Sequence, residues 1–293
     1  MKIEAPAKIN LFLHIGSRRD DGYHNLESLA VFVRVGDELS FEPAEAISLE
    51  IDGPFASDLH AEKNNLVLKA AAALAEYAVL KSKQNFDPRI EHARKMGAHI
   101  RLTKNLPVAS GIGGGSADAA AALRGLTLLW DLHIDKEMLD RIALLLGADV
   151  PVCLLNKPAW MEGVGERVTP IFGIPELPMV LVNPRVAIST ARIFGALKER
   201  TGTGQVPKPK NMRDVKTLAN YLRATANDLE APAIEEAPVI NEVLASLSQN
   251  GAALSRMSGS GATCFGLFLD HFAAHMAVDA ISKANPDWWV TVA

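Results

Sequence analysis

The pattern of apolar and polar positions divides the chain into short strands and helices. Runs rich in β-branched and large apolar residues predict strands over 9–15, 29–35, 39–41, 47–51, 98–104, 151–155, 179–183, 254–257, 263–269 and 289–292. Apolar residues at helical spacing predict helices over 65–80, 117–129, 136–146, 190–198, 239–249 and 271–284. Gly147 and Gly251 follow two of these helices, where a glycine favours termination. We expect loops over most of 81–97 and over the Gly- and Pro-containing segment 201–210.

Length and composition add the class of protein. The 293 residues, 48% hydrophobic and 22% charged, indicate a globular protein of about two domains. Glycine and proline recur over 158–175, so we place one domain at 1–160 and the second at 161–293. The formal net charge of -4 argues against nucleic acid or an anionic membrane as a partner.

The cysteines and the apolar segments indicate a compartment. The chain has two cysteines, Cys153 and Cys264, too few for a disulfide framework or a zinc cluster. Glu4 and Lys8 interrupt the N-terminal apolar residues, which is not the pattern of a signal peptide. No apolar run approaches the length of a membrane span. We therefore expect a cytoplasmic protein; the sequence leaves its oligomeric state open.

The segment 106–120 is the most informative part of the chain. Glycines at 111 and 113–115 free the backbone to adopt positive φ and to approach a ligand closely. We expect Ser116 to cap the helix that follows. A glycine loop that leads into a helix N-terminus offers N–H groups to an anion, most naturally a phosphate. Neither the dinucleotide-binding fingerprint nor the Walker loop fits, because Ser116 and Ala117 stand where those motifs need glycine and lysine. A tightly packed turn is the simpler alternative.

Three other features gain meaning together with this loop. Lys8 begins a strand and shares a face with Asn10, although alone it is more simply a solvated lysine at a strand edge. Asp149 follows a helix in an apolar context, where an aspartate is usually a cap or turn former. It could instead orient a hydroxyl and accept its proton. The small-residue turn 258–262 is an ordinary connection or a second source of backbone amides for a phosphate. The histidines show no metal-binding spacing.

Together these motifs resemble the GHMP small-molecule kinases. The glycine loop is similar to their ATP-phosphate loop, and residues 258–262 to their C-terminal glycine motif. The resemblance is most specific in residues 5–11, 21–26 and 147–151. These segments are similar to the GHMP kinases of isoprenoid biosynthesis that act on a cytidine diphosphate-linked methylerythritol. The resemblance implies an α+β, two-domain GHMP kinase fold with the active site in the cleft between the domains. Ala109 and Ser110 stand where members often carry glycine, and Ala117 where serine is common.

The resemblance also implies roles for individual residues. Lys8 and Asp149 correspond to the catalytic pair, and Lys104 to a lysine that contacts the nucleotide. The residues matching the ATP-phosphate segment are Pro107, Val108, Ala109, Ser110, Gly111, Ile112, Gly113, Gly114, Gly115, Ser116 and Ala117. The residues expected at the substrate are Asn10, Tyr23, His24, Thr190, Phe194, Gly259 and Gly261. Tyr23 and Phe194 would stack on the cytosine ring and His24 would read its edge.

The expected reaction is transfer of the ATP γ-phosphoryl group to the 2-hydroxyl of the methylerythritol unit, with Mg²⁺ on the phosphates and Ser116 as its hydroxyl ligand. Asp149 would take the hydroxyl proton, while Lys8 would keep Asp149 ionised. Other GHMP kinases, of the homoserine or mevalonate type, are the nearest alternative. A catalytically inactive nucleotide-binding regulator and a Rossmann oxidoreductase are more distant alternatives.

Overall fold

The computed structural model describes residues 1–59, 65–85 and 96–293. Its packing forms two compact units, and strands β1 (Lys2–Arg18) and β2 (His24–Ala44) contribute residues to both. Most of the loop predicted over 81–97 lies outside the described residues, as do His60 and His92. None of the helices in the described ranges has the length and apolar character needed to cross a membrane.

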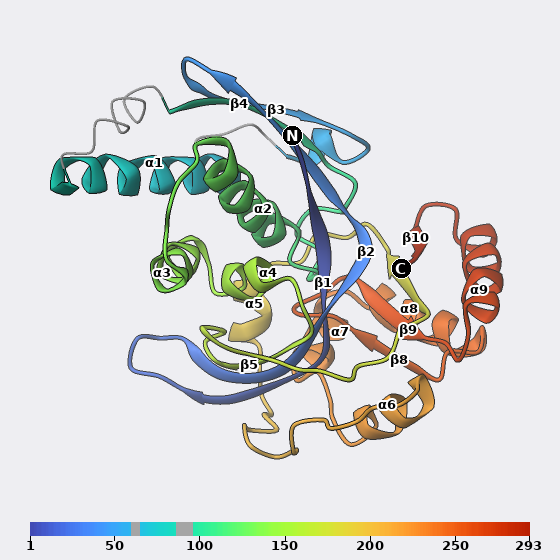
Figure 1. Cartoon of the computed structure of the whole chain (residues 1–293). Coiled ribbons are helices and arrows are strands. Elements are labelled where there is room, and N and C mark those ends of the chain that lie inside the picture. Colours follow the sequence, from blue (N-terminus) through green and yellow to red (C-terminus); the bar gives the residue numbers. More distant parts are fainter. Residues whose placement is uncertain (60–64, 86–95) are drawn as a thin grey trace. The chain divides into compact units, whose positions relative to one another are not determined.

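The first unit comprises 1–7, 36–108 and 113–156. The C-terminal half of β2 pairs antiparallel with β4 (Gly97–Thr103), which pairs parallel with β3 (Ile47–Asp52). Helix α1 (Leu66–Asn85) lies beside α2 (Gly114–Leu129) (Figure 1). The unit also contains a 3-10 turn at Ala56–Asp58 and two further helices, α3 (Lys136–Leu146) and α4 (Val150–Leu155). Ten residues of α2 are buried, and its alanines permit this close packing of helices.

The second unit comprises 8–35, 109–112 and 157–293. The N-terminal half of β2 pairs with β5 (Ala159–Gly163), and β5 pairs with β6 (Arg167–Pro170). A separate sheet has the order β10-β7-β9-β8, with the strands Trp289–Val292, Met179–Asn183, Cys264–Leu267 and Leu254–Met257. The helices of this unit are α5 (Thr190–Gly195), α6 (Val215–Leu222), α7 (Glu230–Glu236), α8 (Val239–Gln249) and α9 (His271–Ala284).

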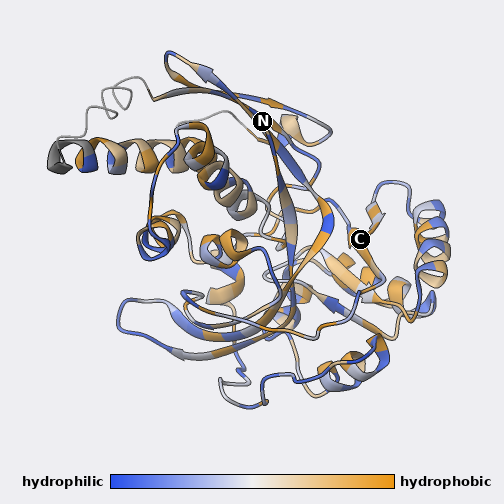
Figure 2. Cartoon of the chain, in the orientation of Figure 1, coloured by the Kyte–Doolittle hydropathy of each residue, from blue (hydrophilic) through white to orange (hydrophobic). Residues whose placement is uncertain are grey.

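Amphipathic helices cover the second sheet. Buried residues of β7, β9, α8 and α9 form one apolar core, and α9 shows alternating hydrophobic and hydrophilic colours (Figure 2). Asp270 begins α9 by accepting a hydrogen bond from the Ala273 N–H group, which satisfies one of the free donors of the first turn. Burial of the apolar face supplies the main driving force for this packing.

Several predicted elements differ from the observed ones. The strand predicted over 151–155 is wrong, because these residues form α4 with Pro151 in its first turn, a position that proline favours. A short apolar run does not distinguish a strand from a buried helix. Residues 39–41 belong to the continuous strand β2, and α5 ends at Gly195 rather than at residue 198. Gly147 ends α3 as expected, although in an extended conformation.

The two units do not follow a single cut in the sequence, since residues 8–35, 109–112 and 157–160 pack in the second unit. The boundary at 160 therefore stays a prediction.

Candidate functional site

The glycine segment leads into α2 three residues earlier than the sequence predicts. The helix begins at Gly114, and Gly113, with φ 66°, is its N-cap residue. The expectation that Ser116 caps this helix is wrong, because the hydrogen bond from Ala117 N to Gly113 O already closes the first turn around it. Ser116 instead lies half-buried in that turn. The first turn of a helix has N–H groups without intrahelical partners and carries the positive end of the dipole, so this end of α2 suits an anion.

The middle of the glycine segment, 109–112, packs in the second unit. Thr263 N donates to Ser110 O at 3.1 Å, and Lys8 N donates to Ile112 O at 2.9 Å. A Cβ atom at Gly111 would lie 2.4 Å from the Ser258 carbonyl oxygen. Glycine is therefore required here by close backbone approach, as well as by its φ of 76°.

A buried hydroxyl joins the three motifs that meet in this unit. Ser258 Oγ accepts a hydrogen bond from Asn10 N at 3.1 Å and donates to Gly111 O at 3.1 Å. Asn10 and Ser258 are 248 residues apart in the sequence. The strand that carries Lys8, the glycine segment and the turn 258–262 thus form one hydrogen-bonded arrangement.

The two predicted catalytic residues occupy different kinds of site. Lys8 is 2% exposed, so the alternative of a solvated lysine at a strand edge is excluded. Asp149 is half-buried and stands at the N-cap position of α4, where its side chain makes no capping hydrogen bond. The simpler role of Asp149 as a helix cap is therefore excluded too. Their catalytic roles stay predictions.

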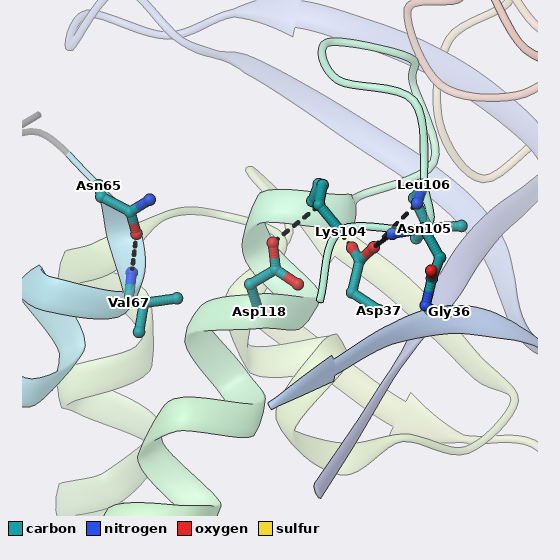
Figure 3. Close-up of polar contacts among 8 residues, drawn as sticks. All are labelled: Gly36, Asp37, Asn65, Val67, Lys104, Asn105, Leu106 and Asp118. Carbon is teal, nitrogen blue, oxygen red and sulfur yellow. Dashed lines mark hydrogen bonds and ion pairs between the residues drawn. The ribbon is translucent and has the colours of Figure 1, made fainter. Parts of the chain in front are cut away.

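Lys104 lies in a buried cluster of charges with Asp37 and Asp118 (Figure 3). Its ammonium donates to Asp37 Oδ2 and, at 2.8 Å, to Asp118 Oδ2. Burial opposes the charge on Lys104, but the two carboxylates overcome this and raise its pKa. Burial also raises the pKa of Asp118 to about 8, against the attraction of the Lys104 ammonium. The other oxygen of Asp118, Oδ1, is buried and has no hydrogen-bond partner among the described residues, which adds to the cost of placing a charge there. Contact of Lys104 with a nucleotide stays a prediction.

Several predicted substrate residues come together in the second unit. The rings of His24 and Phe194 lie 5.8 Å apart between centroids, with their planes at 33°. Thr190 Oγ1, on the same helix as Phe194, shares a hydrogen bond of 2.7 Å with Ser260 Oγ in the turn 258–262. Tyr23 precedes His24 and is 63% exposed. An accessible aromatic beside a ring pair is suited to stacking on a planar ligand.

Asn10 differs from these accessible residues. Its side chain is buried and donates to Ser28 Oγ at 2.7 Å, and Ser28 in turn donates to Phe12 O. This network fixes the strand beside Lys8. Contact of the Asn10 side chain with substrate stays a prediction.

A magnesium ion fits the residues available if phosphate oxygens supply most of its ligands. Among the described residues no group of three His, Cys, Asp or Glu side chains is arranged to hold a metal. Mg²⁺ in phosphoryl-transfer enzymes is commonly held by one or two protein oxygens together with substrate phosphates and water. The half-buried Ser116 hydroxyl in the first turn of α2 suits that limited role.

Sequence patterns marked the turn 258–262 and the segment 106–120 but assigned no role to the side chains of Ser258, Ser260 and Asp118. They did not mark Asp37. Asp118 is a charged residue among the alanines of the helix that follows the glycine loop, and this unusual position could have indicated a role. The structure shows that it is buried. Asp37 and Lys104 are 67 residues apart, so their pairing has no local signature.

Comparison with known families gives two matches along the chain. Residues 65–157 match the family described as GHMP kinases N terminal domain. Residues 205–287 match the family described as GHMP kinases C terminal.

Curated relatives and solved structures extend the similarity to nearly the whole chain. The chain is 49% identical to 4-diphosphocytidyl-2-C-methyl-D-erythritol kinase of Paramagnetospirillum magneticum, over 99% of this chain and 97% of that protein. It is 48% identical to the enzyme of the same name from Ruegeria pomeroyi, over 99% and 98%. A crystal structure of 4-(cytidine 5'-diphospho)-2C-methyl-D-erythritol kinase aligns with a TM-score of 0.79 and 32% identity, covering 100% of this chain and 98% of that one.

More distant structures support the fold. Homoserine kinase from Cytophaga hutchinsonii aligns with a TM-score of 0.71 at 18% identity, covering 100% of this chain and 94% of that one. These similarities confirm the expected α+β GHMP kinase fold.

Proposed function

Because the chain belongs to the 4-diphosphocytidyl-2-C-methyl-D-erythritol kinase family of GHMP kinases, we propose that it phosphorylates 4-diphosphocytidyl-2-C-methyl-D-erythritol. The γ-phosphoryl group of ATP is transferred to the 2-hydroxyl, and the products are the 2-phosphate and ADP. The observation that carries the proposal in the structure is the hydrogen-bonded chain Asn10–Ser258–Gly111. It joins three motifs whose combined presence the reaction needs.

Asp149 and Lys8 are the proposed catalytic pair. Asp149 orients the acceptor hydroxyl and accepts its proton, and the positive charge of Lys8 favours the alkoxide that develops at that oxygen. Phosphoryl transfer needs little covalent participation by the protein, so the positions of these two charges account for most of their effect.

Residues 107–117 hold the triphosphate in this proposal. The glycine backbone lets N–H groups reach phosphate oxygens, and the N-terminus of α2 contributes its dipole. Lys104 contributes a nearby positive charge to the nucleotide site. Mg²⁺, with Ser116 as a protein ligand, neutralises phosphate charge when it is bound.

The cytidine end of the substrate lies against the aromatic residues of the second unit. Tyr23 and Phe194 stack on the cytosine ring, and His24 supplies the polar contact that distinguishes this base. Thr190, Gly259 and Gly261 contact the polar part of the same substrate, consistent with the hydrogen bond between Thr190 and Ser260. Cys153 and Cys264 are both in the reduced, thiol form, which agrees with the cytoplasmic location that we propose.

The experiment that tests this function is a substrate panel with purified protein, ATP and Mg²⁺, in which ADP release is measured. The cytidine substrate should support turnover, whereas homoserine and mevalonate should not. Turnover with homoserine or mevalonate alone would replace the proposal by the alternative kinases. ATP binding without formation of ADP in the presence of any of these substrates would instead identify a nucleotide-binding regulator.

We expect His24→Ala and Phe194→Ala each to raise the KM for the cytidine substrate about 5- to 150-fold, because a lost contact worth about 1–3 kcal/mol weakens binding by that factor. The KM for ATP should not change. Steady-state kinetics with each substrate varied in turn measure both values. Phe172→Ala, which removes an exposed aromatic of the same unit, is the matched control and should leave both values unaltered. An increase in the KM for ATP alone would show that the pocket is misplaced.

A further inference from the structure

The carboxylate of Asp37 uses both of its oxygens on three consecutive residues. Oδ1 accepts hydrogen bonds from Asn105 N at 2.6 Å and from Leu106 N at 2.8 Å, while Oδ2 accepts from Lys104 Nζ. The Asp37 side chain is completely buried. Figure 3 shows Asp37 between the Lys104 side chain and the backbone of the next two residues. This one side chain therefore fixes the segment 104–106.

Backbone contacts hold Lys104 from the opposite side. Its N–H donates to Asp52 O at 2.7 Å, and its carbonyl accepts from Phe55 N at 3.1 Å. A Cβ atom at Gly53 would lie 2.7 Å from Lys104 N, so this contact leaves no room for adjustment. Lys104, the residue that directly follows β4, is thus held by backbone contacts. Asp37 then sets the direction in which the chain continues.

A carboxylate is the side chain suited to this position. It offers two acceptor oxygens and no donor, so it can accept from an ammonium at one end and from two amides at the other. An asparagine would turn its NH₂ group toward either Lys104 or the two backbone N–H groups. Either orientation leaves donors facing donors in a buried place, which is costly. The requirement therefore concerns the ionised carboxylate and not merely a side chain of this size.

We propose that Asp37 is a positioning residue for ATP, because it fixes the backbone that enters the phosphate segment. That segment begins at Pro107, directly after Leu106. The inference rests on the proposed function, in which residues 107–117 hold the triphosphate. Asp37 itself does not touch the reacting atoms. It sets where the first residues of the segment lie. Small displacements of binding groups lower the rate of phosphoryl transfer strongly, because this reaction depends on positioning.

Asp118→Asn provides a matched control for Asp37→Asn. Both carboxylates pair with Lys104, but the hydrogen bonds to the 105 and 106 amides come from Asp37. An asparagine at position 118 keeps a carbonyl oxygen that can accept from the Lys104 ammonium, and its introduction alters neither of the two amide contacts. The comparison separates the loop contact from the general cost of altering a buried ion pair.

The test is steady-state kinetics of the full-length variants, well below their melting temperatures as measured by circular dichroism. Asp37→Asn should raise the KM for ATP and lower kcat/KM for ATP about 10²-fold, with the KM for the cytidine substrate unchanged. Asp118→Asn should resemble wild type in all three values. Wild-type kinetics in Asp37→Asn, or an equal loss in Asp118→Asn, would overturn the inference. Absence of ATP turnover in the wild-type protein would overturn the proposed function instead.

Asp37→Glu covers the case in which Asp37→Asn does not fold. It keeps the charge for Lys104 and both acceptor oxygens, but displaces them by one methylene. We expect a folded protein with a raised KM for ATP and an unchanged KM for the cytidine substrate. Equal changes in both KM values would show a general structural role and contradict the proposal.

Discussion

Asp149→Asn and Lys8→Ala should each lower kcat about 10²–10⁴-fold, the range typical of general acid–base groups. Asparagine keeps the shape of Asp149 but cannot accept the proton of the acceptor hydroxyl. Removal of the Lys8 ammonium takes away the positive charge that favours the developing alkoxide. The measurement is kcat at saturating ATP and cytidine substrate, with circular dichroism to verify the fold.

Each of these variants has a matched control. Asp135 stands at the N-cap position of α3, where its side chain accepts from Met138 N; asparagine is an equally good N-cap residue, so Asp135→Asn should spare both stability and kcat. Lys2 lies on the same strand as Lys8 but is exposed, so Lys2→Ala should be silent. Rates close to wild type in both Asp149→Asn and Lys8→Ala would remove these residues from the chemistry.

Gly111→Ala should lower kcat/KM for ATP about 10²-fold, as expected when a binding segment is displaced by about 1 Å. The new Cβ atom would lie 2.4 Å from Ser258 O and 2.6 Å from Gly261 N. Both are backbone atoms, so the glycine segment or the turn 258–262 must move. The measurement is initial rate against ATP concentration at saturating cytidine substrate.

Gly251→Ala separates backbone strain from this close approach. Gly251 also has a positive φ, of 91°, but a Cβ atom there would meet nothing within 4 Å. Its replacement should cost about 1–2 kcal/mol of stability and leave kcat/KM for ATP unaltered. Equal kinetic losses in both variants, or none in Gly111→Ala, would contradict the proposed role of the close packing.

Local patterns predicted the elements whose ends carry their own signals. The bounds of α3, α8 and α9 agree with the predicted helices, because apolar spacing defines them and Asp135 and Asp270 cap two of them. The prediction of a strand over 151–155 was wrong, because a short apolar run between turns fits either a strand or a buried helix. The start of α2 was placed too late, because the low helix propensity of Gly114 and Gly115 is outweighed by the packing of this turn.

The motifs could be recognised from the sequence, whereas the contacts that hold them could not. The residues proposed for catalysis and binding follow from local motifs and a family resemblance. The hydroxyl of Ser258 and the carboxylate of Asp37 act on residues 248 and 67 positions away. Such pairings depend on the fold, and nothing in the neighbouring residues of either sequence position indicates them.

The most direct test of the central claim is ³¹P NMR of the reaction of the wild-type protein with ATP, Mg²⁺ and 4-diphosphocytidyl-2-C-methyl-D-erythritol. The account predicts one new phosphomonoester resonance on the methylerythritol unit, assigned to the 2-oxygen, in equal amount to the ADP formed. Release of inorganic phosphate with the cytidine substrate unaltered, or phosphorylation at another oxygen, would contradict it.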